Sequence, residues 1–455
     1  MQADFRSLSA RVFLAAFGVR AIYALGLYAT MGDAGLMAPD SVGFYATTQA
    51  FVQSLANGTA PLWQWVSGPD LQLMPLFTWL LAANIMLFGK EAALTFVLLQ
   101  AVIDSGTCVL VCLMAARFHE RLAVPAAIAA ILNPTQVVIA GLVFSDTLFV
   151  FFVALFLYGS LRWLRRPDWH SAILIGLGLG GGALSRVVLS YWVPAFIAFL
   201  FVSLLVRRQV NRRHLAQLAV IVLIYAIGVS PVVIRNTLQF GSFSVTAQSE
   251  THLLYWIVPL VSEAKDGTTW EVGVKKMQDR VRARYGELEG DAFENAPKLR
   301  AVATEALREL GPLAIAKAWL YGAAINLGAP SITYMPPVAQ MPRTGFYATR
   351  GDSFAGKITN FLLYSDAAWY ARLLLIGIAG LTLIRLVQAI GLVSLACSQV
   401  FTAGVFLLVF WGGYILAING PVASPKYRLP LEPPLNILTA AGYCALRARW
   451  KRREA

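Results

Sequence analysis

Charged residues are scarce in this sequence. Only 13% of the 455 residues are charged and 58% are hydrophobic, whereas soluble domains have about 25% charged residues. A water-soluble globular fold is therefore excluded, and the long apolar runs predict an all-α polytopic membrane protein. The net charge of +13 does not indicate nucleic acid as a partner, because the basic residues lie in short clusters between apolar runs.

Cysteine and histidine are also rare, with four of each. All four cysteines lie inside apolar runs, so none is placed for a disulfide in an outer loop. His252 is the only histidine expected on the extracytoplasmic side, and it has no companion at a ligand spacing, so no metal residues are assigned. No cofactor is predicted; a divalent metal is compatible with the sequence but not indicated by it. The serines lack a nucleophile-elbow context.

The transmembrane topology follows from about 20 apolar residues per crossing and from lysine and arginine remaining in the cytoplasm. These two rules predict about ten transmembrane helices with both chain termini cytoplasmic. Whether the apolar runs 71–88 and 313–327 cross the membrane or lie on its outer surface stays open, and the positions of the basic clusters favour the surface. The expected crossings are 10–31, 92–116, 122–143, 147–163, 171–185, 188–206, 215–234, 368–384, 392–418 and 434–446.

Three regions follow from this topology. Residues 1–235 form a transmembrane module whose first outer loop is 32–91. Residues 236–366 are far more polar and form a long extracytoplasmic loop with surface or re-entrant helices. Residues 367–455 form the C-terminal transmembrane helices, with an outer basic loop at 419–433.

Two acids are expected at the outer ends of helices. Asp40 lies between Pro39 and Ser41, just beyond the first crossing, which would hold a carboxylate at the boundary of water and lipid. Asp146 lies at the outer start of the 147–163 crossing and faces the same compartment. Each could instead cap a helix, and the local sequence does not decide between capping and chemistry.

Four cations are also expected at outer helix ends, against the orientation rule. An unpaired charge near the membrane is unfavourable, and phosphate is a natural partner for arginine. Binding of lipid head groups, or pairing with acids such as Glu432, remains an alternative. The four residues are Arg186, Arg235, Lys426 and Arg428.

Arg20 and Asp104 are the ionisable residues predicted to lie within the hydrocarbon. They are expected at similar depths in the first two crossings, and neither is stable alone there. We therefore predict an intramembrane Arg20–Asp104 ion pair with a structural role.

The order of these features resembles the GT-C class of membrane glycosyltransferases, specifically its protein O-mannosyltransferase-like and aminoarabinose-transferase-like group. The resemblance spans residues 39 to 433. It is carried by Pro39-Asp40-Ser41 with Tyr45, Leu132-Asn133-Pro134, Ser145-Asp146-Thr147-Leu148-Phe149, Ala183-Leu184-Ser185-Arg186, Pro231 to Asn236 with Gly241, and Lys426 to Pro433.

This resemblance implies a catalytic acid in the first outer loop, which Asp40 matches, and a second acid at Asp146. Two features depart from the group. Ser41 stands where many relatives have a second acid beside the first, and Leu73-Met74 stand before Pro75 where aminoarabinose-type members carry a lysine. The first departure puts a metal-binding acid pair in doubt, and the second argues against an aminoarabinose donor.

The functional hypothesis is sugar transfer from a polyprenyl-phosphate donor to an acceptor hydroxyl or amine, on the outer face of the cytoplasmic membrane. Asp40 would be the general base, with inversion, and Asp146 would assist it. The four outer cations would bind the donor phosphate, and Tyr45 and Asn236 would line the substrate pocket. Membrane lipids and a glycan, lipid or protein acceptor are the expected partners. A transporter or lipid-linked-sugar flippase is the first alternative, although no internal repeat supports it. An O-antigen ligase-like transferase with a polyprenyl-diphosphate donor is the second.

Overall fold

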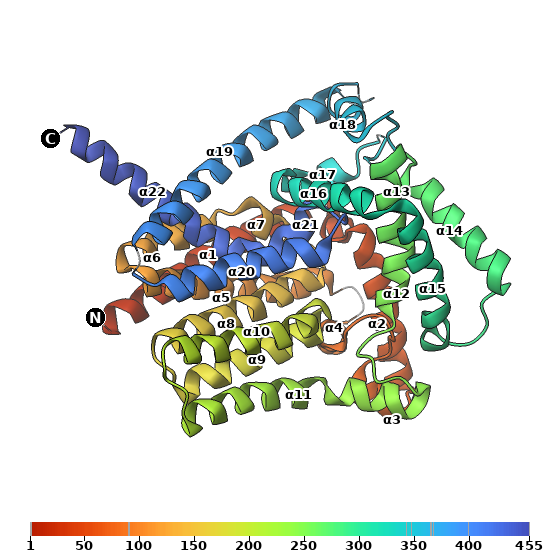
Figure 1. The fold of residues 1–455 in the computed structure, drawn as a ribbon, viewed down its shortest axis with the longest axis horizontal. Coiled ribbons are helices and arrows are strands. Elements are labelled where there is room, and N and C mark those ends of the chain that lie inside the picture. Colours follow the sequence, from red (N-terminus) through yellow and green to blue (C-terminus); the bar gives the residue numbers. More distant parts are fainter. Residues whose placement is uncertain are drawn as a thin grey trace.

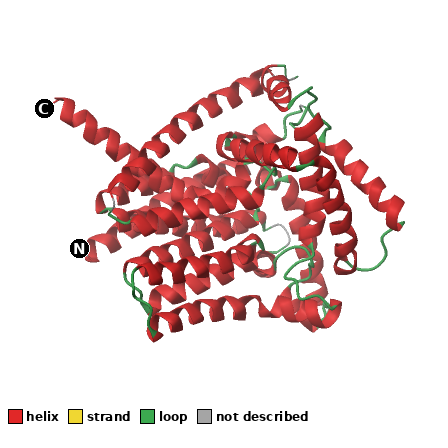
Figure 2. Ribbon diagram, in the orientation of Figure 1, coloured by secondary structure: helices red, strands yellow, loops and turns green. Residues whose placement is uncertain are grey.

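The fold is a helical bundle capped at one end by shorter helices. The computed structural model describes residues 2–89, 92–342, 344–346, 348–364, 366, 368–398 and 400–454, and this part of the chain contains helices and no strands (Figure 2). Both chain termini lie at the same end of the bundle (Figure 1). The bundle helices are α1 (Gln2–Met31), α5 (Ala93–Phe118), α6 (Ala123–Ile131), α7 (Pro134–Ala140), α8 (Ser145–Arg165), α9 (Trp169–Ser185), α10 (Val188–Val206), α11 (Arg212–Phe240), α19 (Ala368–Ser398), α20 (Thr402–Asn419) and α22 (Glu432–Glu454).

Seven of the described helices are long and apolar enough to cross a membrane, and the bent pair α6–α7 would make eight. The chain is therefore a multi-pass membrane protein, as the composition predicts. The expected number was about ten. The two expected crossings that this count leaves out are α9, which has 17 residues, and α22, whose last turns are strongly basic.

One predicted crossing is not a continuous helix. The expected crossing 122–143 is broken into α6 and α7, which meet at an angle of 48°. Pro134 lacks the N–H that would continue α6, and the side chain of Asn133 accepts from the backbone N–H groups of Thr135 and Gln136 to begin α7.

The expected helix end at Arg385 was wrong, because α19 continues without a break to Ser398. The arginine is tolerated inside this helix because its Nε donates to the backbone oxygen of Leu327 at 3.0 Å and its Nη1 donates to Gln388. The next crossing accordingly begins at Thr402 rather than at residue 392.

Close packing of α8, α9 and α11 depends on the glycines of α9. A Cβ added at Gly178 would lie 2.5 Å from the backbone nitrogen of Phe156 in α8, and one at Gly176 would lie 2.8 Å from Cβ of Ile224 in α11. Only glycine permits this approach.

The capping helices lie at the end of the bundle away from the chain termini (Figure 1). Some of them pack on an apolar cluster of their own, which joins Leu254, Met277 and Leu299, whereas α2 and α4 share a cluster with α1 and α5. Helix α4 has 14 residues, so its length of about 21 Å is less than the hydrocarbon thickness of about 30 Å. The capping helices are α2 (Pro39–Ala56), α3 (Leu62–Ser67), α4 (Pro75–Phe88), α12 (Gln248–His252), α13 (Val258–Asp266), α14 (Trp270–Tyr285), α15 (Ala292–Leu310), α16 (Pro312–Gly328), α17 (Pro336–Ala339), α18 (Phe354–Leu363) and α21 (Pro425–Arg428).

Candidate active site

Asp40 lies in the first turn of α2, but it is not the residue that caps this helix. Ser41 makes the capping contact: its Oγ accepts from the backbone N–H of Ala38 at 2.9 Å and donates to the backbone oxygen of Val143 at 2.8 Å. The Asp40 carboxylate instead accepts a hydrogen bond from Lys426 Nζ at 2.6 Å. The Lys426 side chain is 10% exposed and that of Asp40 is 52% exposed. The carboxylate is therefore open to a second molecule while the ammonium is held behind it.

Asp146 lies in the first turn of α8 and forms an ion pair with Arg186, which follows the last turn of α9. A carboxylate is favoured at a helix N-terminus and a cation at a helix C-terminus, so both helix dipoles stabilise this pair. The Asp146 side chain is 4% exposed and that of Arg186 is 28% exposed. The arginine is thus the member that faces outward.

Tyr427 joins the two ion pairs. Lys426 Nζ lies 5.3 Å from the centroid of the Tyr427 ring, and Cζ of Arg186 lies 5.9 Å from the same centroid. Contacts of this length are cation–π interactions. Asp40, Asp146, Arg186, Lys426 and Tyr427 therefore form one group, here named the outer ion cluster.

The electrostatics of the outer ion cluster keep both cations protonated. Burial disfavours a charged Lys426, but Tyr427, Asp146 and Tyr334 outweigh it and raise the lysine pKa above its ordinary value. Burial likewise opposes the charged Arg186, while Asp146, Tyr427 and Asp40 raise its pKa. The cluster therefore holds two fixed positive charges beside two carboxylates.

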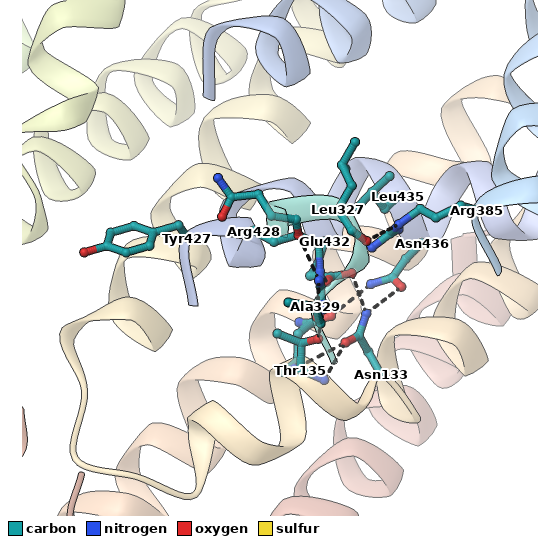
Figure 3. Close-up of polar contacts among 12 residues, drawn as sticks. Asn133, Thr135, Leu327, Ala329, Arg385, Tyr427, Arg428, Glu432, Leu435 and Asn436 are labelled. Atoms are coloured by element: carbon teal, nitrogen blue, oxygen red, sulfur yellow. Dashed lines mark hydrogen bonds and ion pairs between the residues drawn. The ribbon is translucent and has the colours of Figure 1, made fainter. Parts of the chain in front are cut away.

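Arg428 belongs to a different environment, although it is the second residue after Lys426. Its side chain is fully buried, and Nε donates to Glu432 Oε1 at 2.8 Å. Its other donors reach the backbone oxygens of Asn326 and Ala329 and the hydroxyl of Thr135. Figure 3 shows the side chain of Tyr427 directed away from this network. Arg428 thus joins α21 to α7, α16 and α22. Its ion pair with Glu432 is the alternative to phosphate binding that the sequence left open.

The Arg428–Glu432 pair continues into a buried chain of amides. Asn133 Nδ2 donates to Glu432 Oε2 at 2.8 Å and to Asn436 Oδ1 at 3.1 Å (Figure 3). Asn436 in turn donates to Gln136 Oε1 at 2.9 Å, and Gln136 donates to Asp104 Oδ1 at 3.2 Å. Glu432 is therefore connected through hydrogen bonds to the intramembrane acid Asp104.

Asp104 pairs with Arg20, as the sequence predicts. Arg20 Nε donates to Asp104 Oδ2 at 2.6 Å, and the side chains are 1% and 3% exposed. The guanidinium also donates to the backbone oxygens of Ala130 and Ile131 in the last turn of α6, beside the break between α6 and α7. The pair therefore joins α1 to α5 and stabilises the bend.

Arg235 does not reach the outer ion cluster through any contact in the described structure. Its Nη1 donates to the backbone oxygens of Ser67, Gly68 and Asp70 at 3.1 to 3.2 Å, and Nε donates to Asn236 Oδ1 at 2.8 Å. Its guanidinium also lies 5.6 Å from the centroid of the Trp63 ring. Arg235 thus fixes the segment around α3 against α11.

The two predicted pocket residues are buried. Asn236 is fully buried, and its Nδ2 donates to the backbone oxygen of Ser244 at 2.7 Å. Tyr45 is 8% exposed and packs among apolar residues that include Phe77 and Val143. Both are packed within the protein, and neither forms a hydrogen bond or ion pair with the outer ion cluster in the described structure.

Sequence reasoning missed two aromatic residues near the cations. Tyr427 lies within the quoted Lys426 to Pro433 motif, so its position between two charged neighbours was a usable signal. Tyr334 donates to Ser424 Oγ at 3.2 Å and influences the pKa of Lys426. Tyr334 lies in the polar 236–366 region, where no sequence period marks it. Among the described residues, no group of three or more histidine, cysteine, aspartate and glutamate side chains is arranged to hold a metal ion.

Comparison with known proteins finds one family model and several solved structures that are similar to this chain. Residues 69–234 match the family model for dolichyl-phosphate-mannose-protein mannosyltransferases. The archaeal oligosaccharyltransferase AglB from Archaeoglobus fulgidus, solved with an inhibitory peptide and a dolichol-phosphate, aligns over 98% of this chain with a TM-score of 0.55 and 13% identity. The fold of this chain is therefore similar to that of a membrane oligosaccharyltransferase.

Other solved structures are also similar to this chain. An A. fulgidus oligosaccharyltransferase in the apo form aligns over 97% of it, with a TM-score of 0.53 and 13% identity. The chain spans about half the length of that oligosaccharyltransferase, covering 51% and 52% of the two solved chains. ArnT from Cupriavidus metallidurans, bound to undecaprenyl phosphate, aligns over 97% of this chain and 78% of its own, with 16% identity and a TM-score of 0.40. No curated protein matches.

Proposed function

We propose that this protein is a glycosyltransferase of the GT-C class and that it transfers a sugar from a polyprenyl-phosphate donor to an acceptor hydroxyl or amine. The observation that carries the proposal is the 2.6 Å contact between Asp40 and Lys426. In this contact, a half-exposed carboxylate that can accept a proton lies beside a cation that can bind a phosphate. General-base catalysis needs a positioned carboxylate, and a leaving phosphate needs fixed positive charge.

In the proposed step, the acceptor oxygen or nitrogen attacks the anomeric carbon from the side opposite the phosphate. The bond from that carbon to the phosphate oxygen breaks, and its electron pair leaves with the polyprenyl phosphate. Asp40 takes the proton of the acceptor, and the configuration at the anomeric carbon is inverted. Lys426 and Arg186 bind the leaving phosphate, and Asp146 holds Arg186 in place.

Arg235 and Arg428 take a supporting role in this proposal. Their donors are used within the protein: Arg235 binds the backbone around α3, and Arg428 binds Glu432 and three other groups. A phosphate reaching Arg428 would have to displace those contacts from a fully buried guanidinium. We therefore assign phosphate binding to the two cations of the outer ion cluster.

We further propose that the site faces the extracytoplasmic side of the cytoplasmic membrane and that both termini are cytoplasmic. The arginines at the opposite end of the bundle support this orientation, since lysine and arginine accumulate in cytoplasmic loops. They include Arg117, Arg162, Arg166 and Arg213, in or beside the helix ends nearest the chain termini (Figure 1).

Transfer by the purified protein tests the proposal and its alternatives together. Radiolabelled sugars on polyprenyl monophosphate and on polyprenyl diphosphate are supplied with a mixture of glycan, lipid and peptide acceptors, with and without a chelator. We expect transfer from the monophosphate donor. Transfer from the diphosphate alone would favour the O-antigen ligase-like alternative. Movement of the intact lipid-linked sugar across a vesicle membrane without transfer would favour a flippase.

A further inference from the structure

A charged cavity lies at the end of the bundle opposite the outer ion cluster. It has a volume of about 460 Å³ and is lined by residues that include Arg117, Arg162, Arg165, Arg166, Asp168 and Arg213. These residues come from the end of α5, the end of α8, the start of α9 and the start of α11. We name this cavity the arginine pocket.

The arginine pocket has a large excess of positive charge. Five arginines line it against one carboxylate, Asp168. Asp168 lies 3.6 Å from Arg162 and also caps α9 by accepting from the backbone N–H of Ser171. One partly exposed acid cannot neutralise five cations, so the pocket is suited to an anion.

Some of these arginines form contacts with other groups of the protein, and others do not. Arg165 donates to the backbone oxygen of Arg117 and stacks over the ring of Phe401, with Cζ 4.6 Å from its centroid. Arg166 and Arg213 are exposed, and within the described part of the chain neither forms an ion pair or a side-chain hydrogen bond. Arg166 and Arg213 are therefore the guanidinium groups that remain available to a ligand.

An apolar stripe leads away from the pocket along α9. Trp169, Ile173 and Leu177 are 40%, 41% and 48% exposed. They are spaced four residues apart, so they share one helix face. Trp169 stands between Asp168 and His170, both of which line the pocket. A tryptophan in this position is typical of the membrane interface, so the basic cavity and a lipid-facing surface are continuous.

We infer that the arginine pocket binds the phosphate headgroup of an anionic membrane phospholipid, whose acyl chains lie along the apolar stripe of α9. Basic pockets between transmembrane helices are suited to such headgroups. The orientation rule alone requires arginines in these loops. It does not require them to converge on one cavity from three stretches of the sequence.

The test uses full-length protein purified in a non-ionic detergent and titrated with short-chain phosphatidylglycerol, with native mass spectrometry as the readout. The pocket variant is Arg166→Gln with Arg213→Gln. Each basic residue near a membrane surface contributes about fivefold in affinity, so this variant should bind about 25-fold more weakly. The variant Arg166→Lys with Arg213→Lys keeps the charge and should retain most of the binding.

The matched control is Arg208→Gln with Arg212→Gln, which removes the same charge from exposed residues of the neighbouring loop that do not line the pocket. This control should bind like the wild type. Equal losses in the two glutamine variants would overturn the inference, because they would indicate diffuse attraction to surface charge. Equal binding of phosphatidylcholine would also overturn it. Displacement by inorganic phosphate at the same concentration would make free phosphate the ligand and exclude the lipid.

Discussion

Lys426 Nζ lies 2.6 Å from Asp40 Oδ2, although 386 positions separate these residues along the chain. The first outer loop and the segment before α22 therefore complete one site. The family match covers residues 69–234 and includes neither residue. The N-terminal and C-terminal parts of the chain must accordingly fold together before the proposed chemistry is possible.

Replacing Lys426 by glutamine should slow transfer by a factor of about 10² to 10³, because a fixed cation no longer stabilises the leaving phosphate. Lys426→Arg should retain part of the rate, since it keeps the charge. The measurement is initial rate against donor concentration, with Lys275→Gln on the exposed surface of α14 as the matched control. Normal rates for Lys426→Gln would exclude this role.

Asp146 and Arg186 should act as a unit. Arg186→Gln leaves the carboxylate of Asp146, 4% exposed, without its cation, and Asp146→Asn releases Arg186 from its position. We expect each single substitution to lower kcat/KM. Expressed as a free energy, the loss in the double variant should be smaller than the sum of the two single losses, with a coupling energy of about 1 to 3 kcal/mol. A double-mutant cycle on kcat/KM measures this coupling. Additive losses would show that the ion pair has no role in catalysis.

Donor binding should not change as the pH rises above neutrality. The pKa of Lys426 is raised above its ordinary value, because Tyr427, Asp146 and Tyr334 outweigh burial. A raised lysine pKa keeps the ammonium charged below the ordinary value of about 10.4, and the charge is lost only as pH rises through the higher value. Donor KM should therefore stay constant from about pH 7 to 10. An increase in KM across that range, absent from Lys426→Arg, would contradict the assignment.

The intramembrane pair should contribute to stability rather than to chemistry. Arg20→Met leaves Asp104 charged and buried, so the free energy of unfolding should fall by about 3 to 5 kcal/mol. Arg20→Met with Asp104→Leu removes both charges and should recover much of that loss. Thermal unfolding in detergent measures the effect, and Arg11→Met on the exposed face of the same helix is the control. Equal stabilities of the single and double variants would show that the pair is not coupled.

The sequence predicted most clearly what composition and local patterns determine. The crossing 188–206 has the predicted bounds because its apolar run ends at consecutive arginines. The end assigned at Arg385 was wrong because the rule for basic residues assumes exposure to water, whereas this arginine finds a backbone oxygen of α16. Such a partner is a tertiary contact that no local pattern encodes.

The same limit applies to the site. Asp40 could be proposed from its place after the first crossing, and Lys426 from its place before the last. The sequence analysis did not separate Lys426 from Arg428, although Glu432 lies four residues after Arg428 and was a usable local signal for that arginine. The contact of Lys426 with Asp40 of α2 depends instead on the packing of α21, which no local pattern encodes.

The most direct measurement of the central claim is sugar transfer by Asp40→Asn, compared with Asp279→Asn, a matched change on the exposed surface of α14. Asparagine is nearly the same size as aspartate but cannot accept the proton of the acceptor. We predict that Asp40→Asn retains the fold and donor binding of the wild type and loses transfer by a factor of about 10² to 10⁴, while Asp279→Asn transfers normally. Transfer by Asp40→Asn at the rate of Asp279→Asn would contradict the account.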